Sequence, residues 1–162
     1  MTAHALTARP LTVFDAAMLA EMYAATFIAP WDQTWSENSF AEVLAMPGGR
    51  GWLLVADGAP IGFLLARFTL DEGEILLTGI IPDAQHRGHG RRLMEIVIAG
   101  ARDAGVVRLF LEHAAGNDAA AQLYGRFGFA EVGRRAGYYR GAAGQRADAI
   151  VRALNLDGKP PV

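Results

Sequence analysis

Residues 74–93 read EILLTGIIPDAQHRGHGRRL, and this stretch decides the fold. Its first part, Glu74–Ile81, is an apolar run typical of a strand. Beyond Pro82 the apolar residues take on a helical spacing that continues to about Gly105. A second strand pattern follows at Val106–Glu112. A strand, a helix and a second strand in this order predict one parallel pair, because a parallel return needs a crossover connection.

The flanking segments predict antiparallel strands and further helices. Asp57-Gly58 between two apolar segments is typical of a β-hairpin. Thr12, Ser36 and Asn117 stand where helix N-caps are expected, Thr12 in a capping box with Asp15. The other expected strands are 6–9, 51–56, 61–70, 130–139 and 147–154, and the helices are 12–28, 36–45 and 117–126. The residues expected on the buried face of the crossover helix are Leu93, Ile96, Val97, Gly100, Ala101 and Ala104.

These elements predict an α+β fold, with helices on the faces of one mixed and mostly antiparallel sheet. The chain has 162 residues, of which 52% are hydrophobic and 20% are charged. We expect one domain over residues 1–154 and a loose tail over 155–162.

Composition excludes several classes of function. The net charge of −2 gives no general attraction to nucleic acid or to a membrane surface, so neither is expected as a partner. The absence of cysteine excludes disulfides, thiolate metal sites and a cysteine nucleophile. No cluster of histidines with acidic residues has the spacing of metal ligands, so no metal is expected. The N-terminus lacks a signal-peptide pattern and no segment is long and apolar enough to span a membrane, so we expect a cytoplasmic protein.

The glycine-rich turn at the start of the crossover helix predicts an anion site. Glycines let the backbone close around an anion, and the first N–H groups of a helix have no intrahelical partner. The pattern lacks the third glycine of a dinucleotide-binding motif, because that position is Leu93, and it lacks the Gly-Lys-Ser/Thr of a nucleotide-binding P-loop. Without further context, the turn could also simply lead the chain into the helix and bind no anion.

Context comes from the whole segment Thr78–Gly90, which resembles the signature of the GCN5-related N-acetyltransferases, the GNAT family. In that family, Gln/Arg-x-x-Gly-x-Gly/Ala binds the pyrophosphate of acetyl-CoA. Downstream, Leu111–Phe129 is similar to the second half of the same fold. Within the family, the chain most resembles the bacterial ribosomal-protein-alanine N-acetyltransferase subgroup, through Glu112, Asn117, Tyr124, Arg134-Arg-Ala-Gly-Tyr-Tyr139, Asp148-Ala-Ile150 and Trp35-Ser-Glu37. The resemblance covers residues 74–154 well and the first 73 residues poorly.

The resemblance implies a GNAT fold and acetyl-CoA as the acetyl donor. Glu112 would be the general base, acting through water, and Tyr124 the acid that protonates the CoA sulfur. Asn117 would contact the cofactor, and the backbone of Thr78, Gly79 and Ile80 would pair with the pantetheine arm as an added strand. Gly79 would leave room for that arm. The pyrophosphate would lie in the turn formed by Gln85, His86, Arg87, Gly88, His89, Gly90 and Arg91.

Each of these residues also has a purely structural interpretation. Asn117 could be an N-cap alone, Glu112 a solvated carboxylate at a strand end, and Tyr124 a core aromatic. His113 is a rival base, although alternation along the strand sends it to the face opposite Glu112. The aromatic residues that could line an acceptor groove, or equally pack in the core, are Trp31, Trp35, Tyr138 and Tyr139.

The acceptor is expected to be a primary amine. An α-amino group is neutral far more often at physiological pH than a lysine side chain is, since its reference pKa is lower. This favours the N-terminal amine of a protein, such as a ribosomal protein. A small-molecule amine acetyltransferase and a non-catalytic acyl-CoA-binding sensor remain as alternatives.

Overall fold

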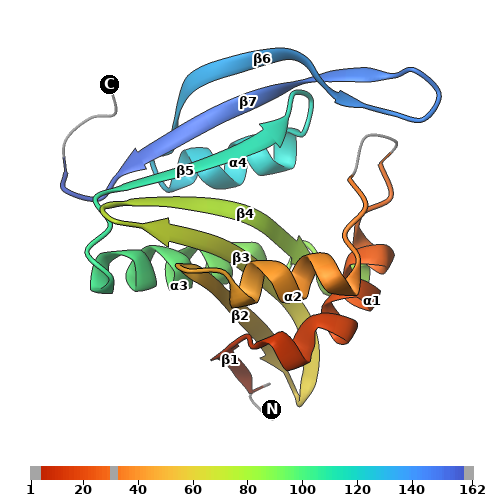
Figure 1. Ribbon diagram of the computed structural model, residues 1–162, viewed down its shortest axis with the longest axis vertical. Helices are drawn as coiled ribbons and strands as arrows, with labels where there is room; N and C mark the ends of the chain where they lie inside the picture. The colour runs from red at the N-terminus through yellow and green to blue at the C-terminus, as the bar shows by residue number, and fades with distance from the viewer. Residues whose placement is uncertain (1–4, 30–32, 159–162) are drawn as a thin grey trace.

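The computed structural model describes residues 5–29 and 33–158. Within them, a 7-stranded sheet has the order β1-β2-β3-β4-β5-β7-β6 (Figure 1). The strands are β1 Leu6–Pro10, β2 Gly49–Ala56, β3 Ala59–Thr69, β4 Glu72–Ile80, β5 Arg108–Ala114, β6 Ala130–Arg140 and β7 Arg146–Asn155. The helices are α1 Ala16–Thr26, α2 Glu37–Ala45, α3 His89–Asp103 and α4 Asp118–Arg126, with short 3₁₀ turns η1 Val13–Asp15 and η2 Pro82–Ala84. This arrangement confirms the expected α+β fold.

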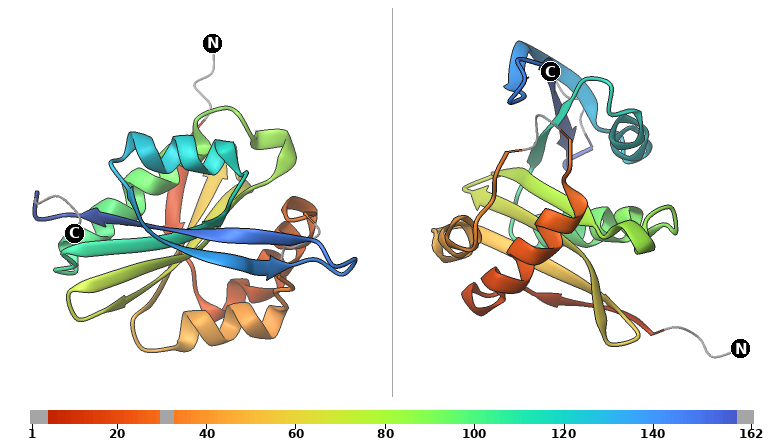
Figure 2. Two further views of the ribbon diagram at one scale, coloured as in Figure 1. Left: turned by 90° about the horizontal axis from the view of Figure 1, so that it is seen from above. Right: turned by 90° about the vertical axis from the view of Figure 1, so that its right-hand side faces the viewer.

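Helices cover both faces of the sheet. Helices α1 and α2 lie on one face, and α3 and α4 lie on the other (Figure 2). The α1–α2 layer buries Leu19 and Phe40 against Phe63 of β3. On the other side, α3 buries Leu93 and Val97 in a separate cluster. Side chains on β3 alternate between the two clusters, as expected for a central strand whose two faces are both covered.

Several local predictions are confirmed by the hydrogen bonds at element ends. The Thr12 amide donates to Asp15 Oδ2 at 2.8 Å, which completes the expected capping box. Ser36 Oγ accepts from the Ser39 amide at 3.2 Å. Asp57 and Gly58 have φ values of 51° and 81°, the left-handed conformation that a tight hairpin turn requires. The first helix, however, ends at Thr26 rather than at residue 28.

The buried face of α3 differs from the prediction. Met94 and Ile98 are buried together with Leu93, Val97 and Ala101, whereas Ile96 is only partly buried and Ala104 is exposed. A helix has a broad apolar stripe, and the part that is buried depends on where the sheet lies against it. The spacing of apolar residues predicted a buried face that is rotated about the helix axis from the face that contacts the sheet.

The parallel strands β4 and β5 pair only at one end. Their register runs from Glu72 opposite Arg108 to Ile75 opposite Leu111, although both strands continue further. On its other edge, β4 has an irregularity against β3, because Leu65 pairs with Leu77 and Ala66 with Ile75. The extra residue on β4 is Leu76, and such a bulge bends its strand. Beyond this point β4 and β5 separate, as Figure 1 shows.

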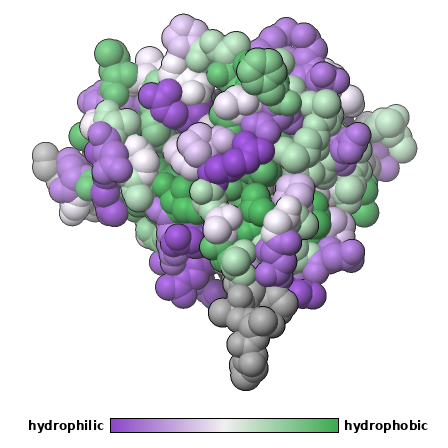
Figure 3. Space-filling model, turned by 90° about the horizontal axis from the view of Figure 1, so that it is seen from below, coloured by the Kyte–Doolittle hydropathy of each residue, from purple (hydrophilic) through white to green (hydrophobic). Residues whose placement is uncertain are grey.

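The end of the chain stays attached to the sheet for longer than expected. Asn155 still pairs with Arg108 in β5, and the Leu156 amide donates to the Val107 carbonyl at 2.8 Å. Within the described ranges, no helix has the length and apolarity needed to cross a membrane. Seen from below in Figure 3, polar side chains surround and interrupt the apolar area of that face.

Candidate active site

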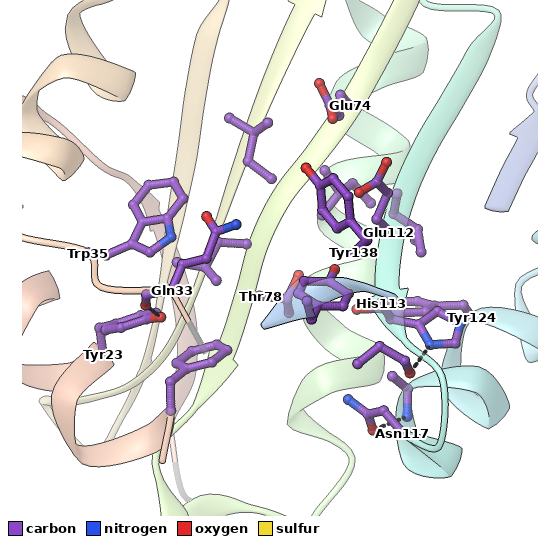
Figure 4. A pocket seen from close by; sticks show the side chains of 18 residues that line it. Tyr23, Gln33, Trp35, Glu74, Thr78, Glu112, His113, Asn117, Tyr124 and Tyr138 are labelled. Carbon is purple, nitrogen blue, oxygen red and sulfur yellow. Dashed lines mark hydrogen bonds between the residues drawn. The ribbon is translucent and has the colours of Figure 1, made fainter. Parts of the chain in front are cut away.

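A cavity of about 350 Å³ lies where β4 and β5 separate. Its walls come from α1, the α1–α2 connection, β4, β5, α4 and β6. Figure 4 shows Tyr23, Gln33 and Trp35 on one side of the space, and Glu112 and Tyr138 on the other. Of the residues predicted from the sequence, the cavity brings together Trp35, Thr78, Glu112, Asn117, Tyr124, Tyr138 and Tyr139. Trp31 lies outside the described residues.

Glu112 on β5 forms part of the cavity wall. Its side chain is 22% exposed, and Oε1 lies 3.1 Å from Arg135 Nη2. Glu112 pairs with Val151 of β7, so its backbone is held by an antiparallel ladder. A half-buried carboxylate facing an open cavity is suited to accept a proton from a molecule bound there. The interpretation as a freely solvated strand-end residue does not fit this position.

Tyr124 on α4 reaches the cavity from the other side of β5. Its ring packs beside Phe129 with the centroids 6.1 Å apart, so it is also a core residue. Burial raises the pKa of Tyr124 above its ordinary value, so the phenol keeps its proton at neutral pH. The Thr78 side chain next to the phenol lowers this pKa, but by less than burial raises it. Tyr124 therefore brings a protonated hydroxyl to the cavity, as a proton donor must.

His113 lines the same cavity, although alternation along β5 placed it on the opposite face. The cavity wraps around the end of β5, which has no neighbouring strand on the β4 side there. Arg152 Nε donates to His113 Nε2 at 2.9 Å, and Nδ1 lies 3.0 Å from the Ala114 carbonyl. Burial is the main reason that the pKa of His113 is lowered, and the Arg152 charge adds to the effect. Both ring nitrogens are engaged, which leaves neither for an incoming amine.

Asn117 caps helix α4 and also lines the cavity. Its Oδ1 accepts from the Ala120 amide at 3.1 Å. The oxygen is thereby used by the cap, while the amide NH₂ is available to a bound molecule. The two interpretations of this residue are compatible.

The edge of β4 that faces the cavity is not paired with β5 beyond Ile75. Thr78, Gly79 and Ile80 lie on this segment, and on their other edge they pair with β3. A Cβ at Gly79 would lie 2.8 Å from Phe63 Cζ and 3.1 Å from Phe27 Cε2. The space left by this glycine is therefore used by core aromatics, which is a packing reason for glycine rather than the room for a ligand that we expected.

The glycine-rich turn lies away from the lining of this cavity, at the start of α3. Gln85 Nε2 donates to the Ile80 carbonyl at 3.0 Å and so ties the turn to the end of β4. His86 and Gly88 have φ values of 59° and 82°. No side chain caps α3, and a Cβ at Gly88 would meet nothing within 4 Å. The first amides of the helix thus face open space, which is the geometry of an anion site.

The charged residues of this turn differ in what they contact. Arg91 and Arg92 form ion pairs with Glu95 at 3.0 and 3.4 Å. Arg91, whose contact is the shorter, is the main cause of the lowered pKa of Glu95. Arg87 and His86 are exposed, and His89 and Gly90 are partly exposed.

Two tyrosines of β6 face Glu112. Tyr138 is 44% exposed, and its ring meets that of Tyr139 edge to face at 5.3 Å. Burial, followed by the Glu112 charge, raises the pKa of Tyr139 to about 12. Trp35, on the opposite side, packs on Phe40 with ring centroids 5.2 Å apart. The cavity therefore has aromatic walls and a carboxylate between them.

The lining residues that sequence reasoning missed include Tyr23, Phe27, Gln33 and Glu74. Tyr23 and Phe27 have the spacing of a core-facing helix, which hid their second role. The Tyr23 hydroxyl donates to the Gln33 carbonyl and so links α1 to the connection that follows it. Glu74, an acidic residue on an apolar strand, was a signal that could have been used. In the described part of the chain, no group of three or more potential metal ligands comes together.

Comparison with known proteins identifies close similarities. Residues 16–129 match the family described as "Acetyltransferase (GNAT) family". The [Ribosomal protein bS18]-alanine N-acetyltransferase of Salmonella typhimurium is 39% identical over 124 residues, which is 75% of this chain and 81% of the relative. The crystal structure of the ribosomal-protein-S18-alanine N-acetyltransferase from Escherichia coli superposes with a TM-score of 0.85 and 31% identity over 94% of each chain.

A plant structure shares the fold at lower identity. It is Arabidopsis thaliana NAA60 in complex with acetyl-CoA, with a TM-score of 0.82, 22% identity and coverage of 95% of this chain and 100% of the other.

Proposed function

Because the chain belongs to the GNAT acetyltransferase family and is an acyltransferase, we propose that it transfers the acetyl group of acetyl-CoA to the N-terminal α-amine of a protein, of the kind that ribosomal proteins present. The observation that carries this proposal is the meeting of a carboxylate from β5 and a phenol from α4 in one cavity, at the point where the parallel strands part. The alternative of a non-catalytic acyl-CoA sensor is set aside, since the relatives are enzymes by name.

Acetyl-CoA would lie across the gap between β4 and β5. The unpaired edge of Thr78, Gly79 and Ile80 offers backbone groups to the pantetheine arm, as an added strand would. The uncapped start of α3 offers amides and the positive end of the helix dipole to the pyrophosphate. The contributing residues are Gln85, His86, Arg87, Gly88, His89, Gly90 and Arg91, with Asn117 on the far side of the gap.

Acetyl transfer requires a neutral amine, a polarised carbonyl and a proton for the departing sulfur. Glu112 would take a proton from the protonated acceptor amine through a water molecule, which leaves the neutral amine. The amine nitrogen then bonds to the thioester carbon, a backbone N–H of β4 stabilises the charge on the carbonyl oxygen, and the carbon–sulfur bond breaks. Tyr124 would give its proton to the sulfur, and the remaining extra proton of the acylated nitrogen would return through solvent to the phenolate. The products are the acetylated amine and free CoA.

The acceptor would enter from the side of the aromatic walls. Tyr138 and Tyr139 border the cavity beside Glu112 and Trp35 borders it on the opposite side, so an extended N-terminus could lie between them with its amine at the carboxylate. The relative from Salmonella typhimurium is named for N-acetylation of an alanine of ribosomal protein bS18. An α-amine also needs less help to lose its proton than a lysine side chain does.

A panel of acceptors tests the proposal. Peptides with N-terminal alanine in a ribosomal-protein sequence would be offered with acetyl-CoA, beside the same peptides blocked at the α-amine, a polyamine and an aminoglycoside. Release of the CoA thiol and mass spectrometry would report the rate and the modified atom. We expect acetylation at the α-amine and none of the blocked peptide. Turnover of the free small amines alone would instead make the chain a small-molecule acetyltransferase.

A further inference from the structure

Arg135 is the cation that contacts the proposed base. Its Nη2 lies 3.1 Å from Glu112 Oε1, and its guanidinium carbon lies 5.1 Å from the centre of the Tyr138 ring. The guanidinium is therefore held between a carboxylate and an aromatic face. One carboxylate oxygen of Glu112 is engaged in this contact, and the other remains to take up a proton.

Arg135 lies on the same face of the sheet as Glu112, directly before a bulge in β6. Glu112 and Gly133 both pair with Val151, and Arg135 stands two residues beyond Gly133, so alternation places its side chain on the face of Glu112. Arg135 then pairs with Ala149 and Tyr139 with Ala147, so Asp148 alone stands opposite residues 136–138. The bulge includes Gly137, whose φ of 57° suits glycine, and it ends where Tyr138 and Tyr139 line the cavity.

Asp148 holds this bulge with both carboxylate oxygens. Oδ1 accepts from the Gly137 amide at 2.8 Å, and Oδ2 accepts from Arg134 Nη1 at 3.2 Å. One contact secures the backbone of the bulge, and the other secures the residue next to Arg135. The carboxylate thus ties the shape of β6 to the place where Arg135 meets Glu112.

We propose that Arg135 is a positioning residue for Glu112, and that Asp148 holds Arg135 in place through its contacts with Arg134 and Gly137 on either side. The inference rests on the proposed role of Glu112 as the base. A general base must face the proton it accepts, and a neighbouring group commonly sets its orientation. The ion pair with Arg135 restricts rotation of the Glu112 carboxylate and directs its second oxygen into the cavity.

The exposure of the pair indicates where its effect will be seen. The side chains of Arg135 and Glu112 are 55% and 22% exposed, and exposed ion pairs contribute little to folding. Loss of Arg135 should therefore act on the rate of acetyl transfer much more than on stability. Because Arg135 would act through Glu112, its effect should fall on kcat rather than on the KM of the acceptor.

Substitution of Arg135 tests the first part. R135Q should lower kcat about 10-fold, with the acceptor KM changed less than about 2-fold, because a misplaced base loses part of its contribution. R135K, which keeps a cationic donor, should recover part of the loss. R140Q removes an exposed arginine from the same strand and should match the wild-type protein. A change in acceptor KM without a change in kcat would contradict the proposal.

A double-mutant cycle tests whether Arg135 acts through Glu112. In the E112Q background, R135Q should have no further effect, since no base remains to be oriented. An undiminished loss there would mean that Arg135 acts on the acceptor or on folding, which overturns the inference. D148N should reproduce the kcat loss of R135Q, and the double variant R135Q/D148N should lose no more than either single variant.

Crystal structures of the wild type and R135Q provide a readout that does not depend on activity. Glu112 should have one side-chain conformation in the wild type. In R135Q it should have either a rotated conformation or two alternative conformations. An unchanged Glu112 in R135Q would refute the positioning role. If the wild-type protein acetylated no amine, the proposed function would fail, while the conformation of Glu112 would still decide whether Arg135 positions it.

Discussion

The two sides of the gap between β4 and β5 are built in different ways. The side assigned to the cofactor comes, apart from Asn117, from one continuous stretch, residues 78–91, and consists mainly of backbone groups. The side assigned to the acceptor comes from α1, the connection after it, β4, β5 and β6, and consists of side chains. A site made of consecutive backbone can be recognised in a sequence, whereas a site made of distant side chains becomes visible only when the chain is folded.

Glu112→Gln should have the largest effect and should affect the acceptor side alone. Loss of a general base typically costs ~10²–10⁴-fold in rate, and the amide keeps the size of the side chain. We expect kcat to fall by this factor while calorimetry shows little change in CoA affinity. Glu21→Gln, an exposed substitution on α1, is the control. Wild-type turnover by the Glu112 variant would remove the base from the mechanism.

Gly88→Leu should instead weaken CoA binding on the cofactor side of the gap. The side chain would enter the open space before the first amides of α3, and we expect CoA affinity to fall by about 10²-fold as those amides are screened. Gly58→Leu is a matched control, because Gly58 has a φ of 81° against 82° at Gly88 and likewise no atom near its Cβ position.

Both glycine substitutions strain a left-handed residue and should cost a similar ~1–2 kcal/mol in unfolding free energy. Thermal or urea unfolding measures this term separately from CoA binding. Equal CoA affinities in the two variants would show that the pyrophosphate lies elsewhere.

Tyr124→Phe should give a smaller loss in kcat, about 10–10²-fold, since a thiolate leaves more readily than an amine and needs less help from an acid. Burial raises the pKa of Tyr124, so the donor form persists as pH rises and is lost only above the ordinary value for tyrosine. The pH–rate profile of the wild type should therefore show no fall from this group below about pH 10. A descending limb near neutral pH that disappears in the Phe variant would contradict this assignment.

Trp35→Leu should have the smallest effect on the reaction and should sharpen the contrast between the two sides. Removing this part of the cavity wall is expected to raise the acceptor KM about 3–10-fold. The KM for acetyl-CoA should stay unchanged, because only contacts with the acceptor are lost. Because Trp35 packs on Phe40, some stability should be lost as well. Trp52→Leu, in the other core cluster, should lose stability without changing acceptor KM.

Local signals in the sequence were sufficient where the interactions themselves are local. The Thr12–Asp15 capping box, the Ser36 N-cap, the Asp57-Gly58 turn and the crossover between parallel strands depend on residues close together in the chain, and all are present in the structure. The buried face of α3 was misjudged because it depends on the sheet beneath the helix. Gly79 was noticed as unusual, but the reason, Phe63 and Phe27 beside it, comes from other elements.

On the acceptor side of the gap, too, the sequence could not predict contacts between distant parts of the chain. Tyr23 and Phe27 looked like core residues, and only the folded chain brings them to the cavity beside Gln33 and Glu74. The engagement of both His113 nitrogens depends partly on Arg152, a residue far away in sequence.

By itself, the sequence determined the fold class and the turn that opens α3, because caps, glycines and strand alternation act over a few neighbouring residues, whereas the candidate pair Glu112 and Tyr124 followed from its resemblance to the GNAT family. Tertiary structure alone decided that β4 and β5 part after Ile75, that Arg135 of β6 meets Glu112 of β5, and that Asp148 of β7 holds the bulge beside that contact. These features arise from pairing between strands, and pairing depends on the geometry of segments that the chain brings together only on folding.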